Sequence, residues 1–367
     1  GELALCQHPS RFEHRGGAAA GVVGAGGVPG EIHRVGDAAV DVAGDDVYEL
    51  AMGSGGVGLA GIGILEDRAG NDQYRGTSLT QGAAIMGVGV LVDRAGYDSY
   101  TAHVYGIGFG GPHGMGALFD LDGNDVYVCG GAQASHYNAL DAPKAKPGDA
   151  DFQYDCFGLG AGAGRRVFVG EPALSNLSQS GGIGLLLDDQ GDDRYDSANF
   201  SQGVGYYKGT GVKIDLHGSD RHAGARYTHG AAAHQGIGFF LDGGGQDRYL
   251  STGPLYTGGV AWDASLALCV DAGQEDDVYE LQQSDGLGRA DHRSWSVFVD
   301  EGGQDRYQIS RGLGEAGVGS LSAFVDLGGE DDYRGLFPVS IQPESDVARR
   351  GNRRTITWQS GGVFVDR

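Results

Sequence analysis

Paired aspartates at a fixed spacing are the residues of this chain best suited to chemistry. They stand in an eight-residue box, Asp-x-x-Gly-x-Asp-x-Tyr, of which Asp120 to Tyr127 is a clear copy. Carboxylate oxygens are ligands for hard cations such as Ca²⁺. Asp, Asn and Gly are also the residues of tight turns, where Asx side chains bond nearby amides. The box therefore predicts either a cation site or a turn that satisfies its own backbone.

The box recurs along the chain at a nearly constant interval. Eight of nine regular copies end in tyrosine, and the copy that begins at Asp215 has His222 there. A tenth copy, Asp271 to Tyr279, is one residue longer and has Glu275 in place of the glycine. Most steps between first aspartates are about 26 to 29 residues, a period that indicates a repeat architecture. One step, from Asp120 to Asp188, is much longer. The regular copies begin at Asp41, Asp67, Asp93, Asp120, Asp188, Asp215, Asp242, Asp300 and Asp326.

The residues in front of each box predict the elements that carry it. In Gly236-Ile237-Gly238-Phe239-Phe240-Leu241, as in other copies, glycine and apolar residues alternate, which is typical of short strands. Two or three strands and turns in each repeat make one coil of a β-solenoid, and coils stack at roughly 4.8 Å. We therefore predict an all-β fold, a parallel β-solenoid (β-helix) with about 26–29 residues per coil and roughly a dozen coils.

Breaks in the rhythm predict the domain limits. Residues 1–36 carry no box and are predicted to be an N-terminal cap or connector, and residues 37–367 the solenoid. We interpret the long step from Asp120 to Asp188 as two coils plus an insertion near residues 131–155, with a coil around residues 167–170 that has lost its box. A second insertion is expected near residues 337–355. Insertions in solenoids map to loops on one face, and we expect both to be solvated loops, with partner contact as the alternative.

Composition limits the partners. A net charge of −23 argues against a nucleic-acid partner, because phosphate contacts need Lys and Arg. No apolar run approaches the roughly 18 residues of a membrane span, so none is expected. Residues 1–30 lack the pattern of a secretory signal peptide. The chain begins without Met and ends one residue into a new box, so we expect it to be processed or cut from a longer protein.

The box resembles the nonapeptide Gly-Gly-x-Gly-x-Asp-x-apolar-x of RTX (repeats-in-toxin) proteins. Gly245, Asp247 and Tyr249 fall on its fourth, sixth and eighth positions, and residues 70–74 and 123–127 match in the same way. In that family, turn carbonyls and the Asp carboxylate bind calcium between neighbouring coils. The resemblance implies calcium as the cofactor and the second aspartates as its ligands: Asp46, Asp72, Asp98, Asp125, Asp193, Asp220, Asp247, Asp305 and Asp331.

The sequence departs from the RTX pattern in two ways. The family repeats its nonapeptide in uninterrupted tandem, whereas a single box per coil allows at most one line of sites here. Its leading glycine is aspartate here, as at Asp93 and Asp300, and this extra carboxylate could add a ligand or bond the turn amides itself. A column of carboxylates one coil apart is costly unless neutralised, which favours an ion. The alternative is a ladder of turns whose countercharge comes from the arginines after the second aspartates: Arg194, Arg221, Arg248 and Arg306.

Other residue types suggest further features. The tyrosines of the boxes, from Tyr48 to Tyr333, predict a stacked aromatic core row, with a sugar-binding strip as the alternative. Cys129 and Cys156 each follow a tyrosine by two residues, and a disulfide is possible if they lie one coil apart. Scattered surface and turn positions are expected for the histidines, and acid–base chemistry is the alternative. These are His103, His113, His136, His222 and His234, while Cys6, His8 and His14 form a weaker metal candidate.

The even repetition of the box favours a non-enzymatic role. We expect a repeat scaffold or a surface or secreted adhesin-like module, stabilised by calcium and located outside the cell or on its surface. Its expected partner is a polysaccharide or another protein chain. One alternative is a polysaccharide lyase or hydrolase, which would need a compact cluster of acids and bases in a groove under one inserted loop. Another alternative is a structural subunit of a larger assembly.

Overall fold

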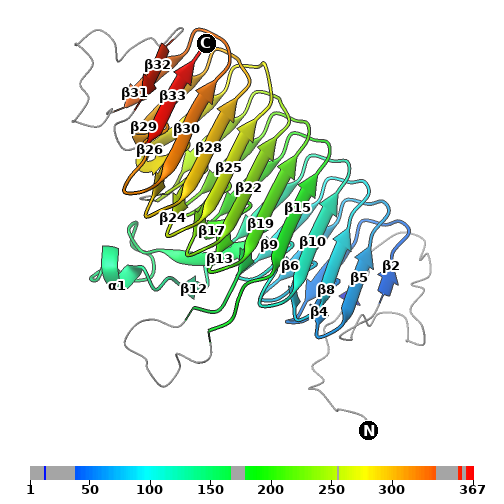
Figure 1. Ribbon diagram of the computed structural model, residues 1–367. Coiled ribbons are helices and arrows are strands. Elements are labelled where there is room, and N and C mark those ends of the chain that lie inside the picture. Colours follow the sequence, from blue (N-terminus) through cyan, green and yellow to red (C-terminus); the bar gives the residue numbers. More distant parts are fainter. Residues whose placement is uncertain (1–11, 14–37, 167–177, 254–255, 336–353, 358–360) are drawn as a thin grey trace.

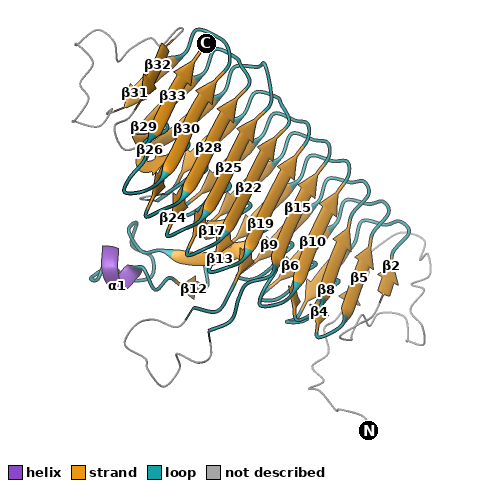
Figure 2. Ribbon diagram, viewed as in Figure 1, coloured by secondary structure: helices purple, strands orange, loops and turns teal. Residues whose placement is uncertain are grey.

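The chain folds as a parallel β-solenoid, which confirms the predicted fold class (Figures 1 and 2). The computed structural model describes residues 12–13, 38–166, 178–253, 256–335, 354–357 and 361–367. Within these ranges the one helix is the four-residue α1 (Asn138–Asp141). No helix in the described part of the chain is long and apolar enough to cross a membrane.

The first sheet is formed by the strands that lead into the boxes. Their alternation of apolar and small residues directs every second side chain inward. The antiparallel strand β32 (Arg354–Thr357) pairs with the last of them. In order, the parallel strands are β2 (Ala38–Val40), β5 (Ile62–Glu66), β8 (Val88–Val92), β10 (Met115–Asp120), β15 (Ile183–Asp188), β19 (Thr210–Asp215), β22 (Ile237–Asp242), β25 (Leu266–Asp271), β28 (Trp295–Asp300), β30 (Leu321–Asp326) and β33 (Gly362–Asp366).

The second sheet is formed by the strands that leave the boxes. Nearly all of them carry the tyrosine of their box on the inward side, and β1 (Phe12–Glu13) pairs antiparallel with the first strand. The parallel strands are β3 (Val47–Leu50), β6 (Gln73–Gly76), β9 (Ser99–Ala102), β11 (Val126–Cys129), β16 (Arg194–Ser197), β20 (Arg221–Gly224), β23 (Arg248–Ser251), β26 (Val278–Gly286), β29 (Arg306–Gly312) and β31 (Asp332–Gly335).

A third, narrow sheet closes each coil. Its strands are two residues long, and a bridge through Gly110 connects its two parts. Two further pairings, of β12 (Gln133–Ala134) and β17 (Asn199–Ser201) with β13 (Tyr154–Gly158), lie beside it. The strands of the third sheet are β4 (Gly58–Leu59), β7 (Ala84–Ile85), β14 (Gly162–Ala163), β18 (Gly205–Tyr206), β21 (Ala232–Ala233), β24 (Ala261–Trp262) and β27 (Ala290–Asp291).

The core lies between the first and second sheets and is built in rows. Stacked tyrosines line the second sheet, with successive ring centroids 4.6–4.9 Å apart wherever two tyrosines are neighbours. This confirms the predicted aromatic core row. Tyr100 and its neighbours are completely buried, so the row cannot be a sugar-binding strip on the surface.

The glycine of the box is required by the close stacking of successive turns. A Cβ at Gly123 would lie 1.9 Å from the carbonyl oxygen of Gly96, and one at Gly191 would lie 1.5 Å from that of Gly123. Gly191 also has a φ of +146°, which residues with a side chain rarely adopt. No other residue type fits these two positions without moving the backbone.

The long step from Asp120 to Asp188 is one coil, so the prediction of two coils plus an insertion was wrong. Strand β10 pairs directly with β15, and Tyr127 of β11 is in register with Tyr195 of β16. The chain leaves the coil, forms the insertion and returns to the same register. Among the described residues the first sheet has eleven parallel strands and the second has ten, so the described part of the solenoid has about ten coils.

The predicted insertion near residues 131–155 is present. It contains β12 and α1, projects from the side of the solenoid (Figure 1), and returns through β13. A disulfide between Cys129 and Cys156, whose Cα atoms are 5.4 Å apart, joins the two ends of this insertion. The proposed cap at 1–36 lies almost entirely outside the described residues, as does the insertion near 337–355. The segment 167–170 and the residues Cys6, His8 and His14 also lie outside them.

Candidate functional site

The two aspartates of each box lie at the edge of the core where the first and second sheets meet. The first aspartate is the inward-facing last residue of its strand, as at Asp120 in β10. The second aspartate stands two residues before the tyrosine, so the two-residue period of a strand turns both to the interior. All nine predicted ligands are buried there: Asp46, Asp72, Asp98, Asp125, Asp193, Asp220, Asp247, Asp305 and Asp331.

The second aspartates form a continuous ladder with the backbone. Oδ1 of each accepts a hydrogen bond from the N–H of the second aspartate one coil earlier, for example from Asp72 to Asp98. Nine such bonds of 2.6–2.9 Å follow one another, including those through Asp277 of the longer tenth box. One oxygen of each carboxylate thus serves the turn, as the ladder alternative predicted.

The first aspartates are bridged by the tyrosine row. The hydroxyl of Tyr127 lies 3.0 Å from Oδ2 of Asp120 and 2.6 Å from Oδ2 of Asp188 in the next coil. Tyr279 bridges Asp271 and Asp300 in the same way, at 2.6 and 2.8 Å. A phenol has one proton and can donate it to one oxygen at a time. Each bridging hydroxyl therefore donates its proton to only one of the two carboxylates that it contacts.

The remaining carboxylate oxygens face one another. In the described part of the chain, no N–H or O–H group donates a hydrogen bond to a further set of buried carboxylate oxygens, apart from a proton that one carboxyl group could share with another. An unsatisfied buried polar group is costly, and an unpaired buried charge more so. These oxygens are Oδ2 of Asp72, Asp98, Asp125, Asp220, Asp247, Asp277, Asp305 and Asp331, and Oδ1 of Asp120, Asp188, Asp215 and Asp271.

Three carboxylates converge at the junctions between coils. Asp93 and Asp98 of one box and Asp120 of the next offer oxygens that all lie within 4.8 Å of one another. The sets Asp67–Asp72–Asp93, Asp120–Asp125–Asp188 and Asp188–Asp193–Asp215 repeat this arrangement. The two aspartate columns are thus close enough to share an ion. The first aspartates, which the resemblance did not assign as ligands, complete the oxygen set.

Burial makes this arrangement sensitive to protons. Burial raises the pKa of Asp98 to about 9 and that of Asp125 to about 10, and the nearby carboxylates add to both shifts. Burial also raises the pKa of Asp93, to about 6, although hydrogen bonds from Tyr74 and Tyr100 oppose the shift. At neutral pH the columns therefore need protons or cations to balance their charge.

One coil carries its own cation. Lys213 occupies the inward row between Leu186 and Phe240 and is completely buried. Its Nζ lies 3.0 Å from Oδ2 of Asp215, 3.2 Å from Nδ1 of His222 and 3.4 Å from the ring centroid of Tyr195. The one signal of this lysine in the sequence is that it interrupts a row of apolar residues at equivalent positions, and the pattern of boxes does not reveal it.

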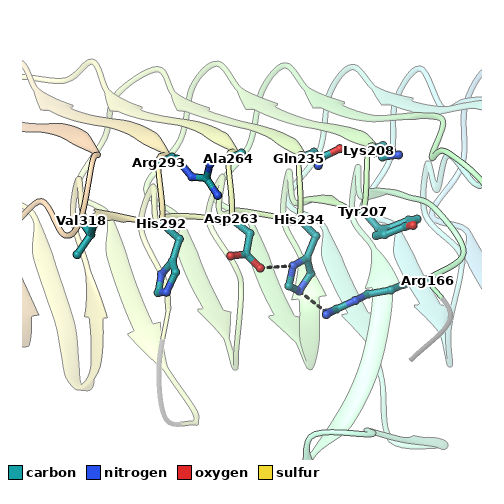
Figure 3. A pocket seen from close by; sticks show the side chains of 10 residues that line it. All are labelled: Arg166, Tyr207, Lys208, His234, Gln235, Asp263, Ala264, His292, Arg293 and Val318. Atoms are coloured by element: carbon teal, nitrogen blue, oxygen red, sulfur yellow. Dashed lines mark hydrogen bonds and ion pairs between the residues drawn. The ribbon is translucent and has the colours of Figure 1, made fainter. Parts of the chain in front are cut away.

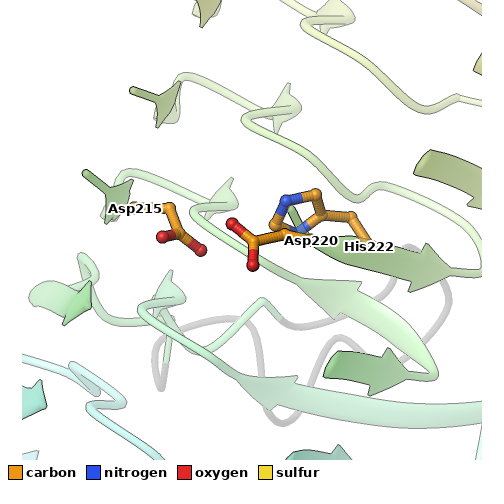
Figure 4. A group of neighbouring side chains, drawn as sticks. All are labelled: Asp215, Asp220 and His222. Carbon is orange, nitrogen blue, oxygen red and sulfur yellow. The ribbon is translucent and has the colours of Figure 1, made fainter. Parts of the chain in front are cut away.

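His222 takes the place of a tyrosine in the same coil. An ammonium group only donates, so Nδ1 of His222 accepts and Nε2–H donates to Oδ2 of Asp242 at 2.7 Å. Burial and the nearby Lys213 lower the pKa of His222, which keeps the ring neutral. Figure 4 shows the carboxylates of Asp215 and Asp220 turned toward each other beside this ring.

The arginines that follow the second aspartates do not supply the countercharge that the ladder alternative predicts. Neighbouring residues of a strand point to opposite faces, so an arginine directly after an inward aspartate points outward. The ion pairs that the structure gives these arginines are with Asp196 and Glu280, on the outer face of the second sheet. They involve Arg194, Arg221, Arg248 and Arg306.

A second candidate site is a cleft of about 560 Å³ at the corner between the third and first sheets (Figure 3). Nδ1 of His234 lies 2.7 Å from Oδ2 of Asp263, and its Nε2 contacts the guanidinium of Arg166. The expectation of scattered surface and turn histidines fails at His222, which is completely buried in β20, whereas it holds for His234 in the turn after β21. The sequence signal of this cleft was weak because Arg166, His234 and Asp263 lie in separate coils. The other lining residues are Tyr207, Lys208, Gln235, Ala264, His292, Arg293 and Val318.

Comparisons of the chain with protein-family models, curated proteins and solved structures found no match.

Proposed function

We propose that this protein is a non-enzymatic repeat scaffold whose turns bind a line of calcium ions, in the manner that the RTX-like resemblance implies. The observation that carries the proposal is the repeated set of three buried carboxylates, such as Asp93, Asp98 and Asp120, with oxygens inside 4.8 Å. Calcium prefers several oxygen ligands, and carboxylates and turn carbonyls are among its common ones. In these sets of three aspartates the donors are oxygen alone.

Charge balance supports a divalent ion. Each coil contributes two box aspartates, and each first aspartate belongs to the sets on both of its sides, as Asp93 does. One divalent cation per coil would neutralise the two carboxylates of that coil. Neutralisation by protons is the competing state, in which the second aspartates are protonated and the ladder needs no metal.

The proposed setting is the cell surface or the extracellular space, with a polysaccharide or another protein chain as partner. The disulfide between Cys129 and Cys156 supports an oxidising compartment, because such bonds are rare in the cytosol. Even repetition of the box along the described coils supports a structural role for it.

Thermal unfolding with calcium or with EGTA tests the proposal. Binding to the folded state alone raises its stability, and several sites together are expected to raise the melting temperature by on the order of ten degrees or more. No shift at neutral pH would overturn the metal proposal and leave a ladder of protonated turns.

An Asp98→Asn variant distinguishes the two states. The amide oxygen of asparagine can still accept the hydrogen bond from the N–H of Asp72, and its NH₂ group can replace the shared proton. We expect little change of stability in EGTA but a smaller stabilisation by calcium. The matched control is Asp122→Asn, at an exposed position of a neighbouring box, which should keep the full calcium effect. Equal calcium effects in both variants would contradict a site at Asp98.

A further inference from the structure

The cleft at the corner of the third sheet is lined by side chains that repeat from coil to coil. Two residues follow each short strand there: Tyr207 and Lys208 after β18, and His292 and Arg293 after β27. All four have positive φ values between 44° and 62°, and the pairs at 234–235 and 263–264 repeat this conformation. Because the corner repeats, its side chains line the cleft in register along the solenoid axis (Figure 3).

The cleft is basic in a strongly acidic chain. Arg166, Lys208 and Arg293 line it with two histidines, whereas the one acidic residue in its lining is Asp263. The ion pairs within the described residues include none for Lys208 or Arg293, and both side chains are exposed. Several exposed arginines elsewhere on the described surface, such as Arg75 and Arg248, pair with glutamates, whereas Lys208 and Arg293 form a local patch of unmatched positive charge. Such a local patch attracts anions.

The carboxylate of Asp263 is already engaged. It accepts a hydrogen bond from Nδ1–H of His234, so Nε2 of that ring faces Arg166 as an acceptor. Burial and the nearby Arg166 lower the pKa of His234, so the ring is neutral and adds no charge. The relay from Asp263 through His234 thus orients the guanidinium of Arg166 within the cleft.

The spacing of the cations indicates an extended ligand. Lys208 and Arg293 lie three coils apart, which corresponds to roughly 14 Å at the usual strand spacing. A single small anion cannot contact both, whereas a chain with separated charges can. The ring of Tyr207 and the amide of Gln235 lie between or beside them and suit the faces and hydroxyls of sugar rings.

We propose that this cleft binds a carboxylated oligosaccharide of the uronate type. Lys208 and Arg293 each contact a carboxylate of this ligand. Arg166, which His234 holds in place, contacts a third polar group of the ligand. The site is separate from the aspartate columns and goes beyond the proposed scaffold function. A nucleic acid is disfavoured because its dense phosphates would meet the acidic remainder of the surface.

Calorimetric titration of the full chain with oligogalacturonates of about six residues tests the proposal. Because uronates themselves bind calcium, free calcium is kept constant and low in every titration. We expect the hexamer to bind, galacturonic acid alone to bind far more weakly, and a neutral hexasaccharide not to bind. Added salt should weaken binding, because exposed charges are screened.

Matched variants locate the site. Lys208→Gln and Arg293→Gln are each expected to weaken hexamer binding about tenfold, as loss of a charged hydrogen bond does. Arg75→Gln, at an exposed ion pair with Glu49 on the second sheet, serves as the control and should not change it. Asp98→Asn should leave binding intact, which separates this site from the proposed cation column. Equal binding of the neutral hexasaccharide, equally tight binding of hexaglutamate, or cleft variants that behave like Arg75→Gln would each overturn the proposal.

Discussion

Among single residues, Lys213 departs furthest from the repeat. A lysine in an apolar row is costly to bury unless its charge is compensated. Here Asp215, His222 and the ring of Tyr195 surround the ammonium group. The lysine replaces a leucine or phenylalanine of the neighbouring coils, and the histidine replaces a tyrosine. We therefore interpret the ammonium group of Lys213 as the cation that balances the aspartates of this coil.

Lys213→Leu should therefore convert this coil into one that needs an external ion. In EGTA we expect a loss of roughly 3–5 kcal/mol in the free energy of unfolding, because Asp215 is left as an unpaired buried charge. Calcium should restore more stability to this variant than to the parent protein. Chemical denaturation with and without calcium measures both values.

The double variant Lys213→Leu/Asp215→Asn is the control for that experiment, because it removes the lysine without leaving a charged, unpaired carboxylate at position 215. It should regain much of the stability in EGTA and lose the added calcium response. A single variant as stable as the parent protein in EGTA would contradict a compensating role for Lys213.

At the scale of elements, a single disulfide joins the two ends of the insertion after β11 to each other. The disulfide joins Cys129 and Cys156, which are 27 positions apart in the sequence. By lowering the conformational entropy of the unfolded chain, a disulfide that closes a loop of this length raises the free energy of unfolding by roughly 3–4 kcal/mol. The coil containing the insertion keeps its register with both neighbours, so the bond fixes where the insertion begins and ends.

Reduction should consequently loosen the insertion before the solenoid. We expect limited proteolysis in dithiothreitol to cleave within residues 130–155 and to leave the flanking coils associated, whereas the oxidised protein resists. Mass spectrometry of the fragments locates the cut. A Cys269→Ala variant should behave like the parent protein, since Cys269 is buried and not in a disulfide. First cleavage outside the insertion would contradict this role of the bond.

At the scale of the whole molecule, the aspartate columns couple stability to pH. The folded state raises the pKa of Asp72 to about 8, of Asp98 to about 9 and of Asp125 to about 10, above an unfolded value of about 3.9. The folded state thus binds more protons than the unfolded state at pH values between the unfolded and the folded pKa. Its stabilisation by protonation is complete below about pH 4 and is lost as the pH rises through about 8 to 10.

In EGTA the melting temperature should therefore fall as the pH rises from 5 to 9. Calcium binds the deprotonated carboxylates, so its stabilising effect should increase over the same range. Melting curves at several pH values, each with calcium or EGTA, measure this. A melting temperature in EGTA that does not change with pH would show that the columns are not held by protons.

Much of the fold follows from the sequence, because a solenoid repeats one local solution. The alternation before the box predicts the first-sheet strands, and the two-residue period from Asp125 to Tyr127 puts both side chains in the core. The nearly constant interval between boxes predicts the coil and the rows of stacked tyrosines and aspartates. Local pattern decides these features, so no distant contact is needed to infer them.

Only the tertiary structure decides which coils are neighbours and what meets between them. A segment of any length can leave a coil and return in register, so the long step after Asp120 could not be divided correctly by arithmetic. Convergence of Asp93, Asp98 and Asp120 depends on how two sheets meet at an edge. Lys213 shows its role only when its coil neighbours are known. The cleft joins its arginine, histidine and aspartate because stacking brings separate coils together, and no sequence period relates these residues.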